Sequence, residues 1–165
     1  MCRAFPLFLA AFLSATAACG SPNGPSPSAL NEFVDALRAR GVSVTVAEEI
    51  SPSNNGYFSV PARVLKVNSG QINVFVYSSP ERAAAQAREI THDAMPSDKV
   101  HITWISTPRF YQKDSLIVLY LGCTQQVLDA LQTILGAPIG TGDTPCGPFA
   151  DLKVGTTQVR SATST

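Results

Sequence analysis

The sequence predicts an α+β domain in two layers, with an antiparallel sheet of about five to six strands and three helices. The predicted strands occur in runs joined by short turns, and the expected order is helix, three strands, helix, two or three strands, helix. Each predicted helix carries apolar residues on one face only, so the helices should cover one side of the sheet. Apolar residues make up 45% of the 165 residues and charged residues 15%, which suffices for one buried core.

Residues 1–18 have the pattern of a signal peptide for export. Arg3 gives a positive start, a short apolar segment follows, and small residues precede Cys19. The apolar segment is too short to cross a bilayer, which takes about 20 residues. The residues Thr16-Ala17-Ala18-Cys19 resemble the lipobox of bacterial lipoproteins, although leucine is more usual at the position of Thr16. The resemblance implies lipid on Cys19, such as palmitate, and anchoring to the cell envelope membrane. The alternative is a secreted protein that is cut near Ala18.

The composition divides the rest of the chain into a linker, a domain and a tail. Residues 19–28 are the lipid anchor and a flexible linker rich in Gly, Pro and Ser. Residues 29–150 form a single α+β domain, and residues 151–165 are small and polar and form a disordered tail. Ser28 should cap the first helix of the domain, and Gly41 should end it.

The first half of the domain should contain three strands after the first helix. The turn Asn68–Gly70 joins the last two strands of this half. A second helix should begin at Ser79 and Pro80, since a capping hydroxyl followed by proline is a typical helix start, and it should run to Ile90. The three strands expected before this helix are Val42–Ala47, Tyr57–Val67 and Gln71–Tyr77.

A hairpin from His101 to Leu121 should form the centre of the domain. Ser115–Leu121 is apolar at nearly every position, which is typical of a strand that is buried on both faces inside a sheet. A last helix, with one apolar face, should run from Thr124 to Gly136. The hairpin concentrates aromatic residues, which are either core or an exposed surface for a partner. The candidate binding residues are Trp104, Arg109, Phe110 and Tyr111.

The four cysteines predict one disulfide bond. Cys2 leaves with the signal peptide and Cys19 takes the lipid, so Cys123 and Cys146 remain in an oxidising compartment. A bond between them should tie the segment after the last helix to the end of the central strand, and it should contribute about 3 kcal/mol. The alternative is a redox-active pair, which usually has the closer spacing Cys-x-x-Cys.

Motifs of known enzymes are missing from the sequence. It contains no Gly-x-Ser-x-Gly, no His-Glu-x-x-His and no P-loop, and it has equal numbers of basic and acidic residues, 12 each. We therefore expect no cofactor and no nucleic-acid partner. Four residues that lie close together in sequence could ligate zinc, but their spacing matches no metal motif, so no metal site is predicted. These weak candidates are His92, Asp93, Asp98 and His101.

Three segments resemble a group of small uncharacterised bacterial lipoproteins: Phe58–Tyr77, Trp104–Tyr111 and Leu116–Gly122. The resemblance extends over most of residues 30–136. It implies an envelope location and an α+β fold, but no activity. In that group a histidine often stands where this chain has Arg109, so a role that needs an imidazole at this position is absent here.

These observations predict a non-catalytic lipoprotein of the cell envelope that binds a protein partner or a small ligand. Its expected partners are the membrane, through the N-terminal lipid, and another envelope protein. The alternative is a small envelope hydrolase or metal-dependent enzyme that uses His92 or His101, and a third hypothesis is a purely structural spacer.

Overall fold

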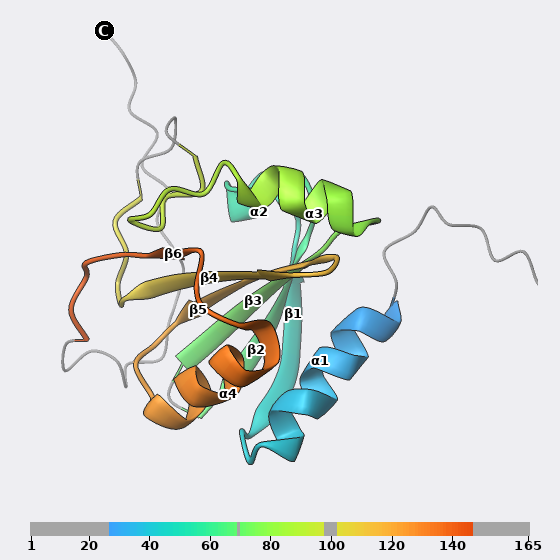
Figure 1. Cartoon of the computed structure of the whole chain (residues 1–165), viewed down its shortest axis with the longest axis vertical. Coiled ribbons are helices and arrows are strands. Elements are labelled where there is room, and N and C mark those ends of the chain that lie inside the picture. The colour runs from blue at the N-terminus through green and yellow to red at the C-terminus, as the bar shows by residue number, and fades with distance from the viewer. Residues whose placement is uncertain (1–26, 69, 98–101, 147–165) are drawn as a thin grey trace, which may run out of the picture.

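The computed structural model describes residues 27–68, 70–97 and 102–146 (Figure 1). The predicted signal peptide, Cys19, Asp98, His101 and the predicted tail lie outside the described residues. In chain order, the elements are α1 (Pro27–Ala39), β1 (Val44–Ile50), α2 (Pro52–Asn55), β2 (Ala62–Val67), β3 (Gly70–Val76), α3 (Pro80–Ala87), β4 (Pro108–Lys113), β5 (Leu116–Leu121), α4 (Gln125–Leu135) and β6 (Gly140–Thr141).

The strands form one six-stranded antiparallel sheet in the order β1-β2-β3-β5-β4-β6, which confirms the predicted α+β class. Strand β5 lies between β3 and β4, and all six of its residues are buried. The uninterrupted apolar run therefore marks an interior strand, as predicted. The first strand of the hairpin begins only at Pro108, because its partner β5 ends at Leu121, which pairs with Pro108.

Helices cover both faces of the sheet, so the predicted two-layer arrangement, with all helices on one side, is wrong. Figure 1 shows α1 and α4 on one side of the sheet and α3 on the other. Tyr111, Val118 and Tyr120 belong to the core cluster that includes α1 and α4. Their neighbours Phe110 and Leu119 belong to a second cluster, which includes α3. Since adjacent side chains of a strand point to opposite faces, a continuous apolar run needs cover on both.

Helix ends follow local sequence signals closely, with small differences. Helix α1 begins at Pro27, one residue before the expected cap at Ser28, and proline suits the first helical turn. Helix α3 begins as predicted, and the Ser79 hydroxyl accepts a hydrogen bond from the Arg82 backbone N–H at 3.4 Å. It ends at Ala87, three residues before the predicted end at Ile90, and irregular turns follow.

The predicted loop before β2 contains the short helix α2, and Asn55 holds that loop together. The Asn55 side chain is buried. Its amide nitrogen donates to the Val60 carbonyl at 2.9 Å, and its oxygen accepts from the backbone N–H groups of Tyr57 and Phe58 at 2.9 and 3.0 Å. These bonds replace the strand pairing that was expected from Tyr57 onward, so β2 begins only at Ala62.

A disulfide bond joins Cys123 to Cys146, with a Cα–Cα distance of 5.9 Å, and confirms the predicted pair. Cys123 follows the end of β5, while Cys146 lies beyond β6, so the bond ties the segment after α4 to the centre of the sheet. None of the helices in the described part of the chain has the length and apolar character needed to cross a membrane.

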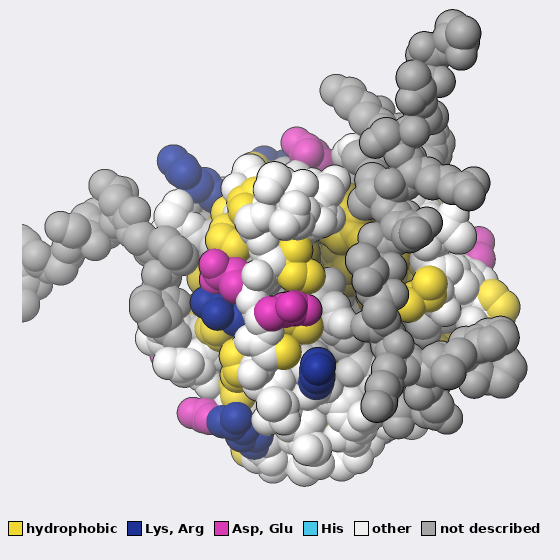
Figure 2. Space-filling view, turned by 180° about the vertical axis from the view of Figure 1, so that it is seen from behind, with side chains coloured by type: hydrophobic (Ala, Val, Ile, Leu, Met, Phe, Trp, Pro, Cys, Tyr) yellow, Lys and Arg dark blue, Asp and Glu magenta, His cyan; other side chains and the backbone are white. Residues whose placement is uncertain are grey.

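The visible surface carries charges of both signs. Figure 2 shows Lys and Arg side chains interspersed with Asp and Glu, and hydrophobic side chains between them. One ion pair joins Arg63 on β2 to Glu49 on β1, with a distance of 2.6 Å between Nη2 and Oε2.

Candidate binding pocket beside helix α3

The four predicted binding residues do not share one surface. Trp104 is only 8% exposed and packs against Phe110, with ring centroids 6.2 Å apart. Tyr111 is buried on the opposite face of the sheet. Arg109 donates a hydrogen bond from Nη1 to the Gly122 carbonyl at 3.0 Å, which ties β4 to the end of β5. The binding role of these residues stays a prediction.

The weak metal candidates do not converge within the described residues. His92 and Asp93 are both exposed in the turns that follow α3. The Asp93 carboxylate accepts a hydrogen bond from the Thr91 hydroxyl. No group of three or more His, Cys, Asp or Glu side chains in the described ranges is placed to hold a metal ion.

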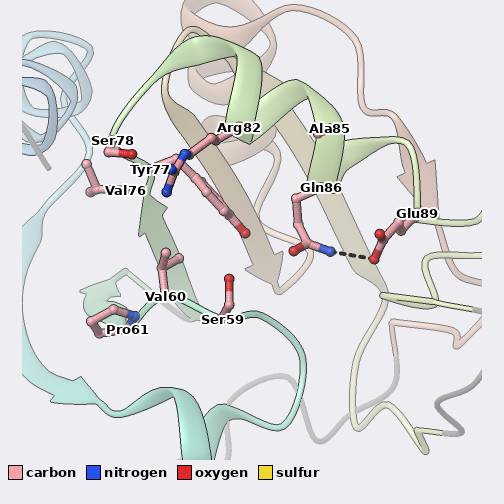
Figure 3. Close-up of a pocket in the computed structure, with 10 residues that line it drawn as sticks. All are labelled: Ser59, Val60, Pro61, Val76, Tyr77, Ser78, Arg82, Ala85, Gln86 and Glu89. Carbon is pink, nitrogen blue, oxygen red and sulfur yellow. Dashed lines mark hydrogen bonds between the residues drawn. The ribbon is translucent and has the colours of Figure 1, made fainter. Parts of the chain in front are cut away.

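A pocket of about 510 Å³ lies where β2 and β3 stop pairing (Figure 3). Their last pair is Ala62 with Phe75, and the next residue on the β2 side is Pro61, which has no N–H to donate to a ladder. The chain therefore diverges at this end of the two strands, and α3 lies over the gap. The α3 pocket is lined by Ser59, Val60, Pro61, Val76, Tyr77, Ser78, Arg82, Ala85, Gln86 and Glu89.

Tyr77 is the central residue of the α3 pocket. Its backbone N–H donates to the Ser115 carbonyl at 2.8 Å, which fixes the residue directly after β3. The side chain is only 4% exposed, and its hydroxyl is buried without a hydrogen-bond partner among the described residues. In Figure 3 this hydroxyl points into the space between Ser59 on the strand side and Gln86 on the helix side.

The Tyr77 hydroxyl is held in its protonated form. Burial raises the pKa of the Tyr77 phenol far above its usual value of 10.0, and the negative charge of Glu89 raises this pKa further. Both effects disfavour the phenolate. The hydroxyl is therefore a neutral group that can donate one hydrogen bond and accept others.

Helix α3 and the turn that follows it supply the polar wall of the pocket. Arg82 and Gln86 are four residues apart in α3, a spacing that keeps side chains on the same side, and Glu89 follows three residues later in the turn. The Gln86 amide nitrogen donates to the Glu89 carboxylate at 2.8 Å. In the described part of the chain, the Arg82 guanidinium has no hydrogen-bond or ion-pair partner.

Sequence reasoning missed this pocket, although two of its signals were present. The polar stripe Arg82, Gln86 and Glu89 runs beside the small apolar stripe that buries Ala83. Tyr77 lies in the short segment between a strand and a helix cap, and binding residues are found disproportionately in such connecting segments. Neither signal shows that the polar stripe and Tyr77 line the same pocket. The pocket depends on where the pairing of β2 with β3 ends.

No protein-family model, no curated protein and no solved structure matches this chain. The α3 pocket combines a cavity, a carboxylate, and a buried hydroxyl and a guanidinium that have no partner among the described residues.

Proposed function

We propose that this protein is an exported lipoprotein, anchored to the cell envelope membrane through lipid on Cys19, that binds a small polar ligand without catalysis. The ligand site is the α3 pocket. The observation that carries the proposal is the Tyr77 hydroxyl, which is buried beside a pocket of about 510 Å³ and has no partner among the residues that the structure describes. An unsatisfied buried hydroxyl costs about 1–3 kcal/mol, and a ligand that accepts its hydrogen bond would offset this cost.

The character of the pocket supports binding in one orientation. Apolar contact comes from Val60, Pro61 and Val76, while a few polar groups are placed at separate points around the cavity. That combination is typical of small-molecule sites of about 300–1,000 Å³. A phenol that stays protonated acts as a hydrogen-bond donor toward the ligand and does not act as a general base.

The proposed location is supported by the sequence pattern of residues 1–19. Lipid at Cys19, followed by the Gly-, Pro- and Ser-rich segment, would hold the binding domain a short distance from the membrane surface. We expect wild-type protein in the membrane fraction and a Cys19→Ser variant in the soluble or released fraction, with the same melting temperature. Wild type without lipid in the released fraction would contradict the anchor.

The ligand site is tested by comparing the small molecules that copurify with two tryptophan variants of the mature full-length chain. Ala85 is exposed and lines the pocket, so Ala85→Trp should fill the mouth of the cavity without entering the core. Gln125 is exposed in α4, on the opposite face of the sheet, and Gln125→Trp is the matched control.

Each protein is extracted gently from native envelopes, and the small molecules bound to it are identified by mass spectrometry. We expect wild type and Gln125→Trp to carry the same small molecule in nearly equal amounts. The same molecule should be absent from Ala85→Trp. If the three proteins carry the same small molecules, or if the molecule stays bound to Ala85→Trp, the α3 pocket is not the ligand site.

A further inference from the structure

The α3 pocket carries opposite charges toward its two ends. Arg82 lies in the first turn of α3 and Glu89 lies just beyond its last turn, and both line the pocket. Glu89 follows Arg82 by seven positions, which corresponds to about 10 Å along a helix axis. In Figure 3 the two side chains lie toward opposite ends of the cavity, with Tyr77 between them.

The groups between the two charges suit an amide backbone. The Tyr77 hydroxyl is a buried donor without a partner in the described chain, so it requires an acceptor. Gln86 uses its amide nitrogen to donate to Glu89 at 2.8 Å, which leaves its amide oxygen as an acceptor on the same wall. One donor and one acceptor at mid-length match the C=O and N–H groups of a peptide.

From these observations we infer that the ligand of the α3 pocket is a short peptide of two or three residues with free ends. Its carboxylate binds Arg82, its ammonium group binds Glu89, and a peptide carbonyl accepts from the Tyr77 hydroxyl. Three extended residues span about 10 Å, which matches the rise along a helix axis between the two residues that carry the charges. A ligand with an anionic group alone would gain from Arg82 but would be repelled by Glu89. This inference rests on the proposed function, because both use the same pocket.

Isothermal titration of the mature full-length protein tests the inference with four defined probes. The probes are tri-alanine, N-acetyl-tri-alanine, tri-alanine amide and free alanine. Tri-alanine should bind. Each blocked peptide should bind at least about tenfold more weakly, because it lacks one charge-assisted contact. Alanine is dipolar but too short to reach both charges, and it should also bind at least about tenfold more weakly than tri-alanine.

Two charge-neutral variants assign each end of the peptide. Arg82→Gln should abolish the difference between tri-alanine and its amide, and Glu89→Gln should abolish the difference between tri-alanine and its N-acetyl form. The matched controls are Arg88→Gln and Glu81→Gln. Both residues are exposed, lie in or next to α3 and do not line the pocket, so these variants should bind like wild type.

The inference is overturned if the blocked and free peptides bind equally, if either pocket variant keeps full discrimination, or if none of the peptides binds. The comparison of wild type with Ala85→Trp from native envelopes shows whether only the peptide inference fails or the proposed function fails as well. A molecule other than a peptide that is retained by wild type and lost from Ala85→Trp would leave the ligand site standing and reject only the peptide. If no molecule is retained and no peptide binds, both proposals are rejected.

Discussion

At the scale of single residues, two buried side-chain polar atoms have no hydrogen-bond partner within the described chain: the Tyr77 hydroxyl and the Trp104 indole nitrogen. Each such group costs about 1–3 kcal/mol relative to a satisfied one. Trp104 offsets its cost by apolar packing, because its ring contacts Tyr57 and Phe110 in the core beneath α3. Tyr77 belongs to the same cluster, and in Figure 3 its hydroxyl points between Ser59 and Gln86, where the proposed ligand would bind.

Replacing Trp104 distinguishes a core residue from an exposed binding residue. Trp104→Ala should destabilise the protein by about 3–5 kcal/mol, because it leaves a large cavity in the second core cluster. Trp104→Phe keeps most of the ring contacts and removes the unpartnered N–H, so it should cost less. Urea unfolding measures both variants. An alanine variant as stable as wild type would show that the ring is not part of the core.

The buried tyrosines predict how stability changes at alkaline pH. Burial raises the pKa of Tyr77 and of Tyr111. For Tyr111, the positive charge of Arg109 opposes this increase in pKa, and the nearby Tyr120 hydroxyl adds to it. In the unfolded chain both phenols lose their protons near pH 10, when the folded chain still holds them. The unfolded state then binds fewer protons, so the free energy of unfolding should fall as the pH rises above about 10.

Tyr77→Phe should reduce this alkaline loss of stability, and the double variant with Tyr111→Phe should reduce it further. Urea unfolding at several values between about pH 9 and 11 measures the slope, and neutral pH gives the reference. Identical slopes for wild type and the double variant would contradict the raised pKa values.

At the scale of elements, the start of α3 matters because this helix forms one wall of the pocket. Ser79 caps it with a hydrogen bond to the Arg82 N–H at 3.4 Å, whereas Thr124 precedes α4 without a side-chain hydrogen bond of that kind. Ser79→Ala should therefore destabilise the protein by about 0.5 kcal/mol, near the lower end for capping residues, and Thr124→Ala should cost less. Chemical unfolding of the two variants side by side tests the contrast, and a larger loss for Thr124→Ala would contradict it.

Most elements of the fold could be predicted because their signals are local. The apolar run of β5, the start of α3 at Ser79 and Pro80, and the end of α4 at Gly136 all depend on neighbouring residues. The side of the sheet that each helix covers is set by tertiary packing, and so was predicted wrongly for α3. The α3 pocket escaped prediction for the same reason, since it exists only because β2–β3 pairing stops at Ala62.

At the scale of the whole molecule, β5 organises two cores, one on each face of the sheet, and the disulfide secures the chain after α4. The Thr107 hydroxyl lies 3.3 Å from the Cys146 sulfur and donates to the Thr144 carbonyl, so the tied segment also packs against the irregular segment that leads into β4. The disulfide therefore holds the chain near the edge of the sheet that β6 forms. The pocket lies elsewhere, beside β2 and β3.

Removing the disulfide should lower stability while leaving ligand binding intact. The two cysteines are 23 positions apart in the sequence. In the chain-entropy model, closing a loop of this size stabilises the folded protein by about 3 kcal/mol. Cys123→Ala combined with Cys146→Ala should lose about that amount in urea unfolding, and reductant should affect only wild type. Alkylation of both thiols in the native, unreduced protein would contradict the bond.

The central claim is that the Tyr77 hydroxyl serves a ligand and not the fold, and the melting temperature of Tyr77→Phe tests it most directly. Wild type and variant are each melted without ligand and with saturating tri-alanine. Without ligand, the variant should melt at the same or a higher temperature, because it removes an unpartnered buried hydroxyl. With ligand, wild type should gain more than the variant. A variant that melts several degrees lower without ligand, or that gains as much from the peptide as wild type, would contradict the account.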